Sequence, residues 1–228
     1  MYTNVNLAAP VGVLLFLGTG FLLLMVGLAL IYSLISKKFG LTRVTLIGIA
    51  AIAGLYFGVM LIFSFTSSEK VLARGQEKHF CEIDCHLAYS VTDVRDAKTL
   101  GNAPHQVKAV GTFRVVTIKT RFDETTTSST RGNSQLYPNS RALAVIDETG
   151  KKYFPSTPGQ SALESSQGGG TPLTTPLQPG ETYATTFVFD LPSDVQNPTL
   201  LIREGEVVTH FIIGHENSPL HKKTRFQI

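Results

Sequence analysis

The chain gathers its two cysteines and two of its six histidines into one short stretch, His79-Phe80-Cys81-Glu82-Ile83-Asp84-Cys85-His86. Two thiols can form a disulfide, and thiols together with imidazoles bind zinc, copper or haem iron. The stretch therefore has two main interpretations. One is a Cys81–Cys85 disulfide. The other is a metal site formed by His79, Cys81, Cys85 and His86.

Geometry restricts the disulfide. Four residues of helix rise about 6 Å, within the Cα range of a disulfide, whereas four residues of strand rise about 13 Å, beyond that range. A Cys81–Cys85 bond thus requires a turn or a single helical turn. An oxidising compartment favours the bond, so we expect a disulfide and no cofactor, with haem c or copper as the alternative.

Both cofactor interpretations depart from known patterns. Cys-x3-Cys-His is one residue longer than the usual haem attachment signal, although longer-spaced variants resemble rare members of the c-type cytochrome family. The same spacing resembles, at a distance, the Cys-x3-Cys of binuclear copper domains. That pattern has a His four residues after the second Cys and a Met beyond it, but this chain has Tyr89 there and no Met after Met60.

Other catalytic signals are absent from the sequence. It contains no Gly-x-Ser-x-Gly, no His-Glu-x-x-His, no phosphate loop and no Gly-x-Gly-x-x-Gly. We therefore expect a protein that is not an enzyme.

Two apolar spans precede this stretch, at about residues 11–35 and 44–65, and neither contains an Asp, Glu, Lys, Arg or His. Each reaches the roughly 20 apolar residues that a helix needs to cross a bilayer. We expect residues 1–66 to form a transmembrane helical hairpin in the lipid bilayer. With no histidine or ionisable group in either span, the helices predict an anchor or scaffold and not an ion or electron path.

The turn at residues 36–43 carries Lys37, Lys38 and Arg43, and basic residues in short loops stay on the cytoplasmic side. We expect a multi-pass protein of the inner (cytoplasmic) membrane, with the N-terminus and the C-terminal domain periplasmic. The segment before the first span lacks the positive charge of a cleavable signal peptide. The 17 remaining Lys and Arg equal the 17 acids, so the net charge of +3 reflects topology and no nucleic-acid partner is expected.

The second span carries a row of small residues, Ala50, Gly54 and Gly58, on one helical face. Small residues let membrane helices approach closely, and Gly20 and Gly27 offer a matching face on the first span. Two interpretations remain open: the two helices pack on each other, or the face docks another integral membrane subunit.

After a linker at residues 67–86, residues 87–228 show the pattern of strands and turns. Period-two alternation places Tyr183, Thr185, Phe187, Phe189 and Leu191 on one face. Two segments, 123–141 and 156–176, read as long loops, and no amphipathic helix is expected. The expected strands are Leu87–Val94, Gly111–Phe122, Leu143–Ile146, Lys152–Phe154, Tyr183–Leu191, Leu200–Arg203 and Val207–Ile213, with a short final strand at Arg225–Ile228. This is an all-β, antiparallel, immunoglobulin-like β-sandwich of about seven strands.

The order of elements resembles a group of bacterial, membrane-anchored, immunoglobulin-like extracytoplasmic domains. The resemblance covers about residues 87–214 and implies a binding or structural module, since a fold alone assigns no activity. It is carried by the runs Val115-Val116-Thr117-Ile118, Val145-Ile146-Asp147-Glu148-Thr149-Gly150-Lys151-Lys152-Tyr153, Leu177-Gln178-Pro179-Gly180-Glu181 and Phe187-Val188-Phe189-Asp190-Leu191-Pro192.

These observations predict a non-catalytic accessory or scaffold subunit of a larger bacterial membrane complex, respiratory or photosynthetic, whose sandwich braces the periplasmic face. Two alternatives remain. One is a metal- or haem-binding electron-transfer protein that uses the His79–His86 stretch, and the other is a stand-alone envelope binding or sensor module.

Overall fold

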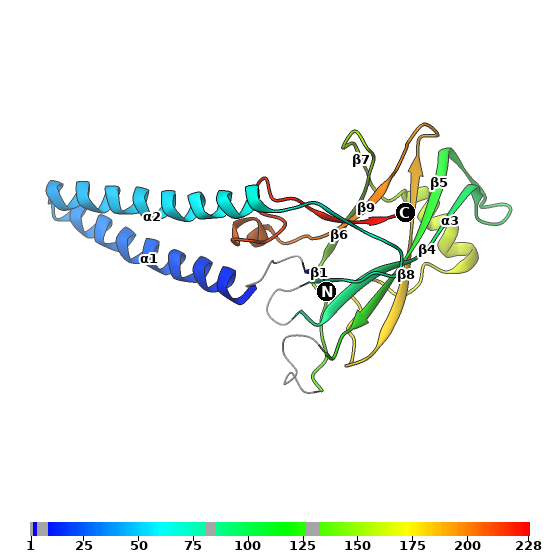
Figure 1. Ribbon diagram of the computed structural model, residues 1–228, viewed down its shortest axis with the longest axis horizontal. Helices are drawn as coiled ribbons and strands as arrows, with labels where there is room; N and C mark the ends of the chain where they lie inside the picture. The colour runs from blue at the N-terminus through cyan, green and yellow to red at the C-terminus, as the bar shows by residue number, and fades with distance from the viewer. Residues whose placement is uncertain (1, 4–8, 81–84, 126–132) are drawn as a thin grey trace. The chain divides into compact units, whose positions relative to one another are not determined.

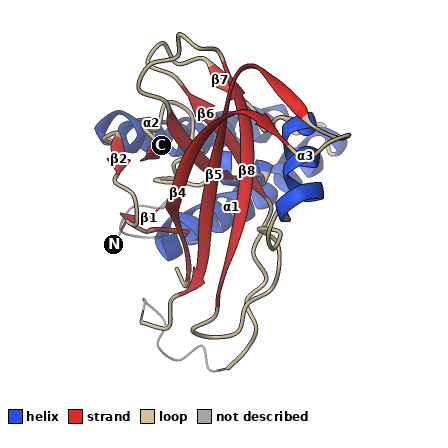
Figure 2. Ribbon diagram, turned by 90° about the vertical axis from the view of Figure 1, so that its right-hand side faces the viewer, coloured by secondary structure: helices blue, strands red, loops and turns tan. Residues whose placement is uncertain are grey.

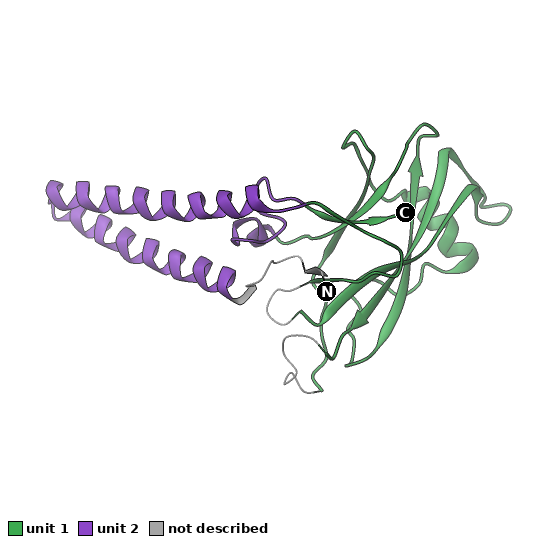
Figure 3. Cartoon of the chain, in the orientation of Figure 1, with its two compact units in different colours: residues 1–4, 69–206, 223–228 green, residues 5–68, 207–222 purple. Residues whose placement is uncertain are grey.

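A computed structural model of the chain describes residues 2–3, 9–80, 85–125 and 133–228. The chain divides into two compact units (Figure 3). The helical unit comprises residues 5–68 and 207–222, and the sandwich unit comprises residues 1–4, 69–206 and 223–228.

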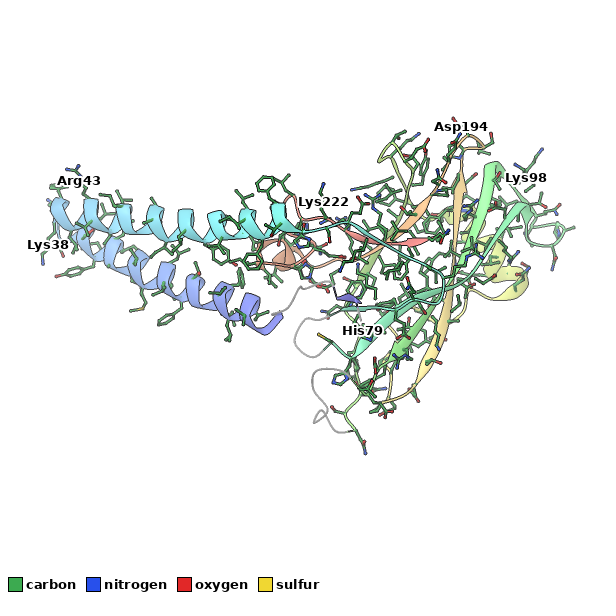
Figure 4. The ribbon with its side chains drawn as sticks, in the orientation of Figure 1. Lys38, Arg43, His79, Lys98, Asp194 and Lys222 are labelled. Atoms are coloured by element: carbon green, nitrogen blue, oxygen red, sulfur yellow. The ribbon has the colours of Figure 1, made fainter. Side chains whose placement is uncertain are left out.

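The helical unit is built on an antiparallel pair of helices, α1 (Ala9–Ile35) and α2 (Phe39–Thr66) (Figure 1). Both are long and apolar enough to cross a membrane, with mean hydropathies of 2.6 and 2.4 over their apolar windows. Lys38 and Arg43 lie at the connected end of the hairpin and Lys222 at the opposite end (Figure 4). The two predicted spans are confirmed as helices. The turn is shorter than expected, because α2 begins at Phe39 and already contains Arg43.

The helices contact each other through a polar pair and a glycine. Ser33 Oγ and Thr42 Oγ1 are 2.9 Å apart beside the turn. A Cβ at Gly48 would lie 3.7 Å from the Val26 side chain, which is ordinary contact. The predicted packing glycines behave differently: no described residue comes within 4 Å of a Cβ built at any of them, namely Gly20, Gly27, Gly54 and Gly58. Ala50 is also exposed. Packing of the hairpin on itself therefore does not use this face.

The sandwich unit consists of two five-stranded sheets (Figure 2). The first has the order β1 (Tyr2–Thr3), β3 (Lys78–Phe80), β4 (Leu87–Leu100), β5 (Val107–Phe122) and β8 (Thr182–Leu191). The second has the order β2 (Lys70–Leu72), β10 (Thr224–Gln227), β9 (Thr199–Glu204), β6 (Arg141–Ile146) and β7 (Lys152–Tyr153). Neighbours pair antiparallel except β1 with β3 and β2 with β10.

Alternation along the central strands creates two apolar layers. Val116 and Ile118 of β5 face the main core between the sheets, together with Phe189 of β8. Phe113 and Val115 point to the opposite face, where a second cluster forms beneath a helix. This helix, α3 (Thr157–Gln167), starts at Ser156, whose side chain accepts a hydrogen bond from the Gly159 amide. The predicted apolar face of the strand Tyr183–Leu191 is confirmed, because its aromatic residues belong to or pack against the main core.

Several expectations about residues 67–228 were wrong. The expected seven-strand antiparallel pattern is not confirmed, since the described residues form two five-stranded sheets with two parallel pairs. The expected linker 67–86 contributes β2 and β3. The expected loop 156–176 contains α3. Sequence patterns did not predict this helix, because Ala162 and Leu163 are its only buried apolar side chains and leave no clear helical periodicity. The expected strand Val207–Ile213 is instead a 3-10 helix at Val207–Phe211, in the helical unit.

Candidate functional site

The predicted Cys/His stretch connects β3 to β4 at one end of the sandwich. His79 lies in β3 and pairs with Ala88 of β4, which in turn pairs with Arg121 of β5. Residues directly opposite in neighbouring strands point to the same face of the sheet. The register therefore brings the His79 imidazole and the Arg121 guanidinium to one face, near the point where β5 ends.

Asp123, just after β5, is the centre of the cluster. Its Oδ2 accepts hydrogen bonds from His79 Nε2 at 2.8 Å and from Arg121 Nη2 at 2.9 Å. Its Oδ1 accepts from the Thr125 amide at 2.9 Å and from the Thr125 hydroxyl at 2.7 Å. Arg121 also donates two bonds to Glu77, at 2.7 and 2.6 Å. Each oxygen of the buried Asp123 carboxylate thus accepts two hydrogen bonds.

These contacts shift the pKa values of the cluster. Burial raises the pKa of the Asp123 carboxyl, but the bonds from Thr125, His79 and Arg121 together outweigh it and place that pKa well below its usual range. The hydrogen bond from Arg121 is the main reason that the pKa of Glu77 is lowered, and the bond to Glu77 is the main reason that the pKa of Arg121 is raised. The cluster is therefore built to keep both carboxylates ionised.

His86 reaches the same residue through the backbone. Its Nδ1 lies 2.5 Å from the Asp123 carbonyl oxygen, which can only accept, so Nδ1 carries the proton. The Asp123 amide donates to the His86 carbonyl at 2.7 Å. Both predicted histidines are thus buried and both contact Asp123, one through its side chain and one through its main chain.

Cys85 has a backbone φ of 54°, in the left-handed region, as expected for a residue in a tight turn. No cysteine among the described residues is free. Cys81 lies outside the described residues, so the Cys81–Cys85 bond stays a prediction.

The described residues include one group with the ligand types of a metal site, but it is not the predicted one. Single ligand atoms of Glu77, His79 and Asp123 lie within 4.8 Å of one another. However, the Arg121 guanidinium donates to both carboxylates, and the Nε2 of His79 is directed at Asp123. Arg121 supplies the positive charge that a metal would bring, so as arranged these residues form an ion-paired clasp and do not fit a cation.

A second polar group, which no sequence motif signals, lies inside the sandwich. The register aligns Lys78, Tyr89, Thr120 and Tyr183 across four strands. Lys78 is fully buried, and its Nζ donates to the carbonyls of Ile202 at 2.9 Å and of Thr224 at 3.4 Å, on the other sheet. Burial raises the pKa of Tyr183 to about 12.

The geometry explains why a lysine is tolerated there. Pairing between β9 and β10 is recorded at Leu200–Phe226 and Thr199–Gln227, and continuing that register would bring Ile202 opposite Thr224. The ammonium of Lys78 donates to the carbonyls of both these residues, where the ladder has ended. A buried charge is costly unless hydrogen bonds satisfy it, and these bonds tie the two sheets together.

The α3 segment also borders a hollow of about 550 Å³. Its walls come from α3, from β8 and from the glycine-rich connection between them. The lining includes Gln160, Glu164, Gly170, Leu173 and Phe187. Gln160 is already committed to structure, because its amide nitrogen donates to the Thr186 carbonyl and its oxygen accepts from the Val188 amide. The lining of the hollow thus combines polar side chains, the apolar side chains of Leu173 and Phe187, and the carboxylate of Glu164.

No family model matches the chain, and no curated protein matches it. Solved structures with some similarity include a conserved hypothetical protein from Bacillus anthracis, with 15% identity over 56% of this chain and 89% of that chain and a TM-score of 0.39. Another is a secreted protein from Mycobacterium tuberculosis, with 10% identity over 71% and 98% and a TM-score of 0.39. A third is the yjhA protein from Bacillus subtilis, with 10% identity over 69% and 99% and a TM-score of 0.40. Similarities this low imply no shared activity, and the sandwich assignment rests on the strand pairing of this chain.

Proposed function

We propose that the chain is a non-catalytic accessory subunit of a larger bacterial membrane complex, respiratory or photosynthetic. In this proposal the hairpin crosses the inner membrane with Lys37 and Lys38 on the cytoplasmic side. The N-terminus and an immunoglobulin-like sandwich then lie on the periplasmic side, where the sandwich braces the complex.

The observation that carries the proposal is the uncovered small-residue face of α2. Ala50 and Gly54 are exposed, and no described residue lies within 4 Å of a Cβ built at Gly54 or Gly58. Because the hairpin packs through Gly48 instead, the face is available to a helix from another subunit, and close approach at small residues is how membrane helices associate.

Co-purification tests this proposal. We expect a chain with Gly54→Leu and Gly58→Leu to lose most of its co-migrating subunits after gentle detergent extraction, because two leucines prevent the close helix approach. Gly18→Leu is the matched control, since Gly18 is also an open glycine of the hairpin but lies on α1. If the wild-type chain migrates alone, or if the double variant retains every partner, the accessory-subunit proposal is wrong.

A second candidate function is a stand-alone envelope binding module, and the hollow beside α3 favours it. This function requires no membrane partner and predicts a ligand near Glu164 and Phe187. This candidate would be supported over the first if the wild-type chain migrates alone and if envelope extracts change the nuclear magnetic resonances or the amide hydrogen-exchange rates of α3.

A further inference from the structure

The Val207–Lys222 segment, inserted in the chain between β9 and β10, belongs to the helical unit and lies beside the last turns of α2 (Figures 1 and 3). The Tyr56 hydroxyl donates to the Phe211 carbonyl. A Cβ at Gly12 would lie only 2.6 Å from the Ile213 carbonyl oxygen. At the end of the segment, the Lys222 amide donates to Ser67 Oγ at 2.8 Å. Contacts with both helices thus fix its position along the hairpin.

Part of this segment buries polar side chains and exposes apolar ones, although Ile213 is buried. Four consecutive polar residues, His215 to Ser218, are buried, with exposed fractions of 1 to 4%. Val207, Val208 and Phe211 are exposed by 73, 47 and 44%. A soluble loop buries apolar side chains and exposes polar ones, so this arrangement indicates a surrounding that is itself apolar.

Described polar groups of the segment bond to one another. The Asn217 amide donates to His215 Nδ1 at 2.9 Å, and the Asn217 side chain donates to Thr209 Oγ1 at 2.8 Å. Ser218 Oγ donates to the Ile212 carbonyl at 2.6 Å. Irregular backbone is tolerated at membrane depth only where its polar groups are satisfied within the protein, and these three donors are satisfied within the segment.

The length of α2 sets the depth. Its residues 39–66 span about 42 Å, against about 30 Å of hydrocarbon, which leaves a surplus of about 12 Å. Tyr56 precedes the last residue of α2 by about 15 Å of helix. Even if the whole surplus projected beyond the bilayer on that side, the backbone of Tyr56, whose hydroxyl donates to the Phe211 carbonyl, would still lie about 3 Å inside the hydrocarbon. Tilting the helix shortens its projection and leaves less surplus.

We propose that the Val207–Lys222 segment is a third membrane-embedded element, with Val207, Val208 and Phe211 in contact with lipid acyl chains of the leaflet on the domain side. The proposal rests on the hairpin crossing the membrane, but not on any partner complex. The partner is lipid because the exposed valines and phenylalanine are apolar and Tyr56, which donates to the Phe211 carbonyl, lies at hydrocarbon depth. Lys222, at the end of the segment, lies beside the end of α2, where a lysine reaches phosphate headgroups.

The absence of tryptophan from the chain allows a direct test. The full-length Phe211→Trp variant is reconstituted into phosphatidylcholine vesicles, and a second preparation carries Val207→Trp. Phe154→Trp is the matched control, because Phe154 is an accessible phenylalanine of the sandwich unit, and its exposed fraction of 66% lies between those of Phe211 and Val207. Emission is quenched either by lipids brominated on the acyl chain or by aqueous iodide.

We expect the Phe211→Trp and Val207→Trp reporters to emit at shorter wavelength, to lose most of their emission to brominated lipid and to resist iodide. The Phe154→Trp reporter should show the reverse. Adding Gly12→Leu to Phe211→Trp should shift that reporter toward iodide quenching, because the new side chain collides with the Ile213 carbonyl, whereas Gly18→Leu should leave it unchanged.

Iodide quenching of both segment reporters to the extent seen at Phe154 would overturn the proposal. Because this readout needs only the reconstituted chain, it is independent of co-purification. Lipid quenching of the segment reporters would support this inference even if the co-purification experiment showed that the accessory-subunit proposal is wrong.

Discussion

Replacing Asp123 with Asn should weaken the end of the sandwich by removing two charge-assisted hydrogen bonds. Asparagine keeps one oxygen, which can still accept from the Thr125 amide and hydroxyl. The amide group that replaces Oδ2 instead faces two donors, His79 Nε2 and Arg121 Nη2. Bonds to a charged group contribute about 1.5–3 kcal/mol each. Because the Arg121 side chain is 28% exposed, its bond counts at the low end, and we expect a loss of about 2–4 kcal/mol.

The chain contains its own control for this substitution. Asp147-Glu148-Thr149 repeats the residues of Asp123-Glu124-Thr125, and Asp147 Oδ1 accepts from the Thr149 amide and hydroxyl at the same 2.9 and 2.7 Å. Its Oδ2 accepts only the neutral Tyr153 hydroxyl among the described contacts, at 3.0 Å. Asp147→Asn should therefore cost less, and the difference between the two variants isolates the ionic part of the cluster.

The assay is denaturant unfolding of the full-length chain in detergent micelles, followed by near-ultraviolet circular dichroism of the tyrosines packed in the sandwich. The pKa of Asp123 is lower in the folded than in the unfolded chain, so its contribution is complete above about pH 5 and is lost as the pH falls below about 4. The difference between wild type and Asp123→Asn should shrink over that range. Equal losses for both aspartates, or a difference that does not change with pH, would refute the proposed role of the cluster.

Two further predictions concern the interior. Lys78→Met should destabilise the sandwich by about 2–4 kcal/mol, because two buried carbonyls lose their donor. The control is Lys98→Met, at an exposed lysine that donates to the Gly111 carbonyl. In the same unfolding assay this control should have little effect. Leu163→Ala should cost about 2–5 kcal/mol by leaving a cavity beneath α3, and limited proteolysis should then cut α3 faster than in Ser161→Ala on the exposed face. A stability of Lys78→Met equal to that of Lys98→Met, or an uncut α3 in Leu163→Ala, would contradict these assignments.

Residue patterns with a strong local signal were predictable. The two charge-free spans predict helices because a helix satisfies its backbone hydrogen bonds within a single apolar segment, and the structure has helices at Ala9–Ile35 and Phe39–Thr66. The aromatic alternation from Tyr183 to Leu191 specifies a strand buried on one face, since a slip of one residue would expose it. The turn residues Asp147-Glu148-Thr149-Gly150 also predicted the connection between β6 and β7.

The candidate site depended on contacts between residues far apart in the chain. The sequence pattern indicated His79 and His86 as possible metal ligands. Their partner Asp123 follows a strand some 40 residues later, and only the β3–β4–β5 register brings it to them. Lys78 has no sequence signal at all, because the residues around a lysine cannot reveal that two carbonyls of the other sheet lie within hydrogen-bonding distance of its ammonium.

The sequence by itself determined the two long apolar helices and the β-sheet character of most of the rest, because hydropathy and periodicity are local properties of the chain. Only the tertiary structure decided where equally apolar segments are placed. Val207–Phe211 has the composition of a core strand, yet it packs beside the helices, while Lys78, a charged residue, occupies the core. The physical reason is that the burial energy of a side chain depends on the surroundings that distant segments supply, and the residues near it in sequence do not specify those surroundings.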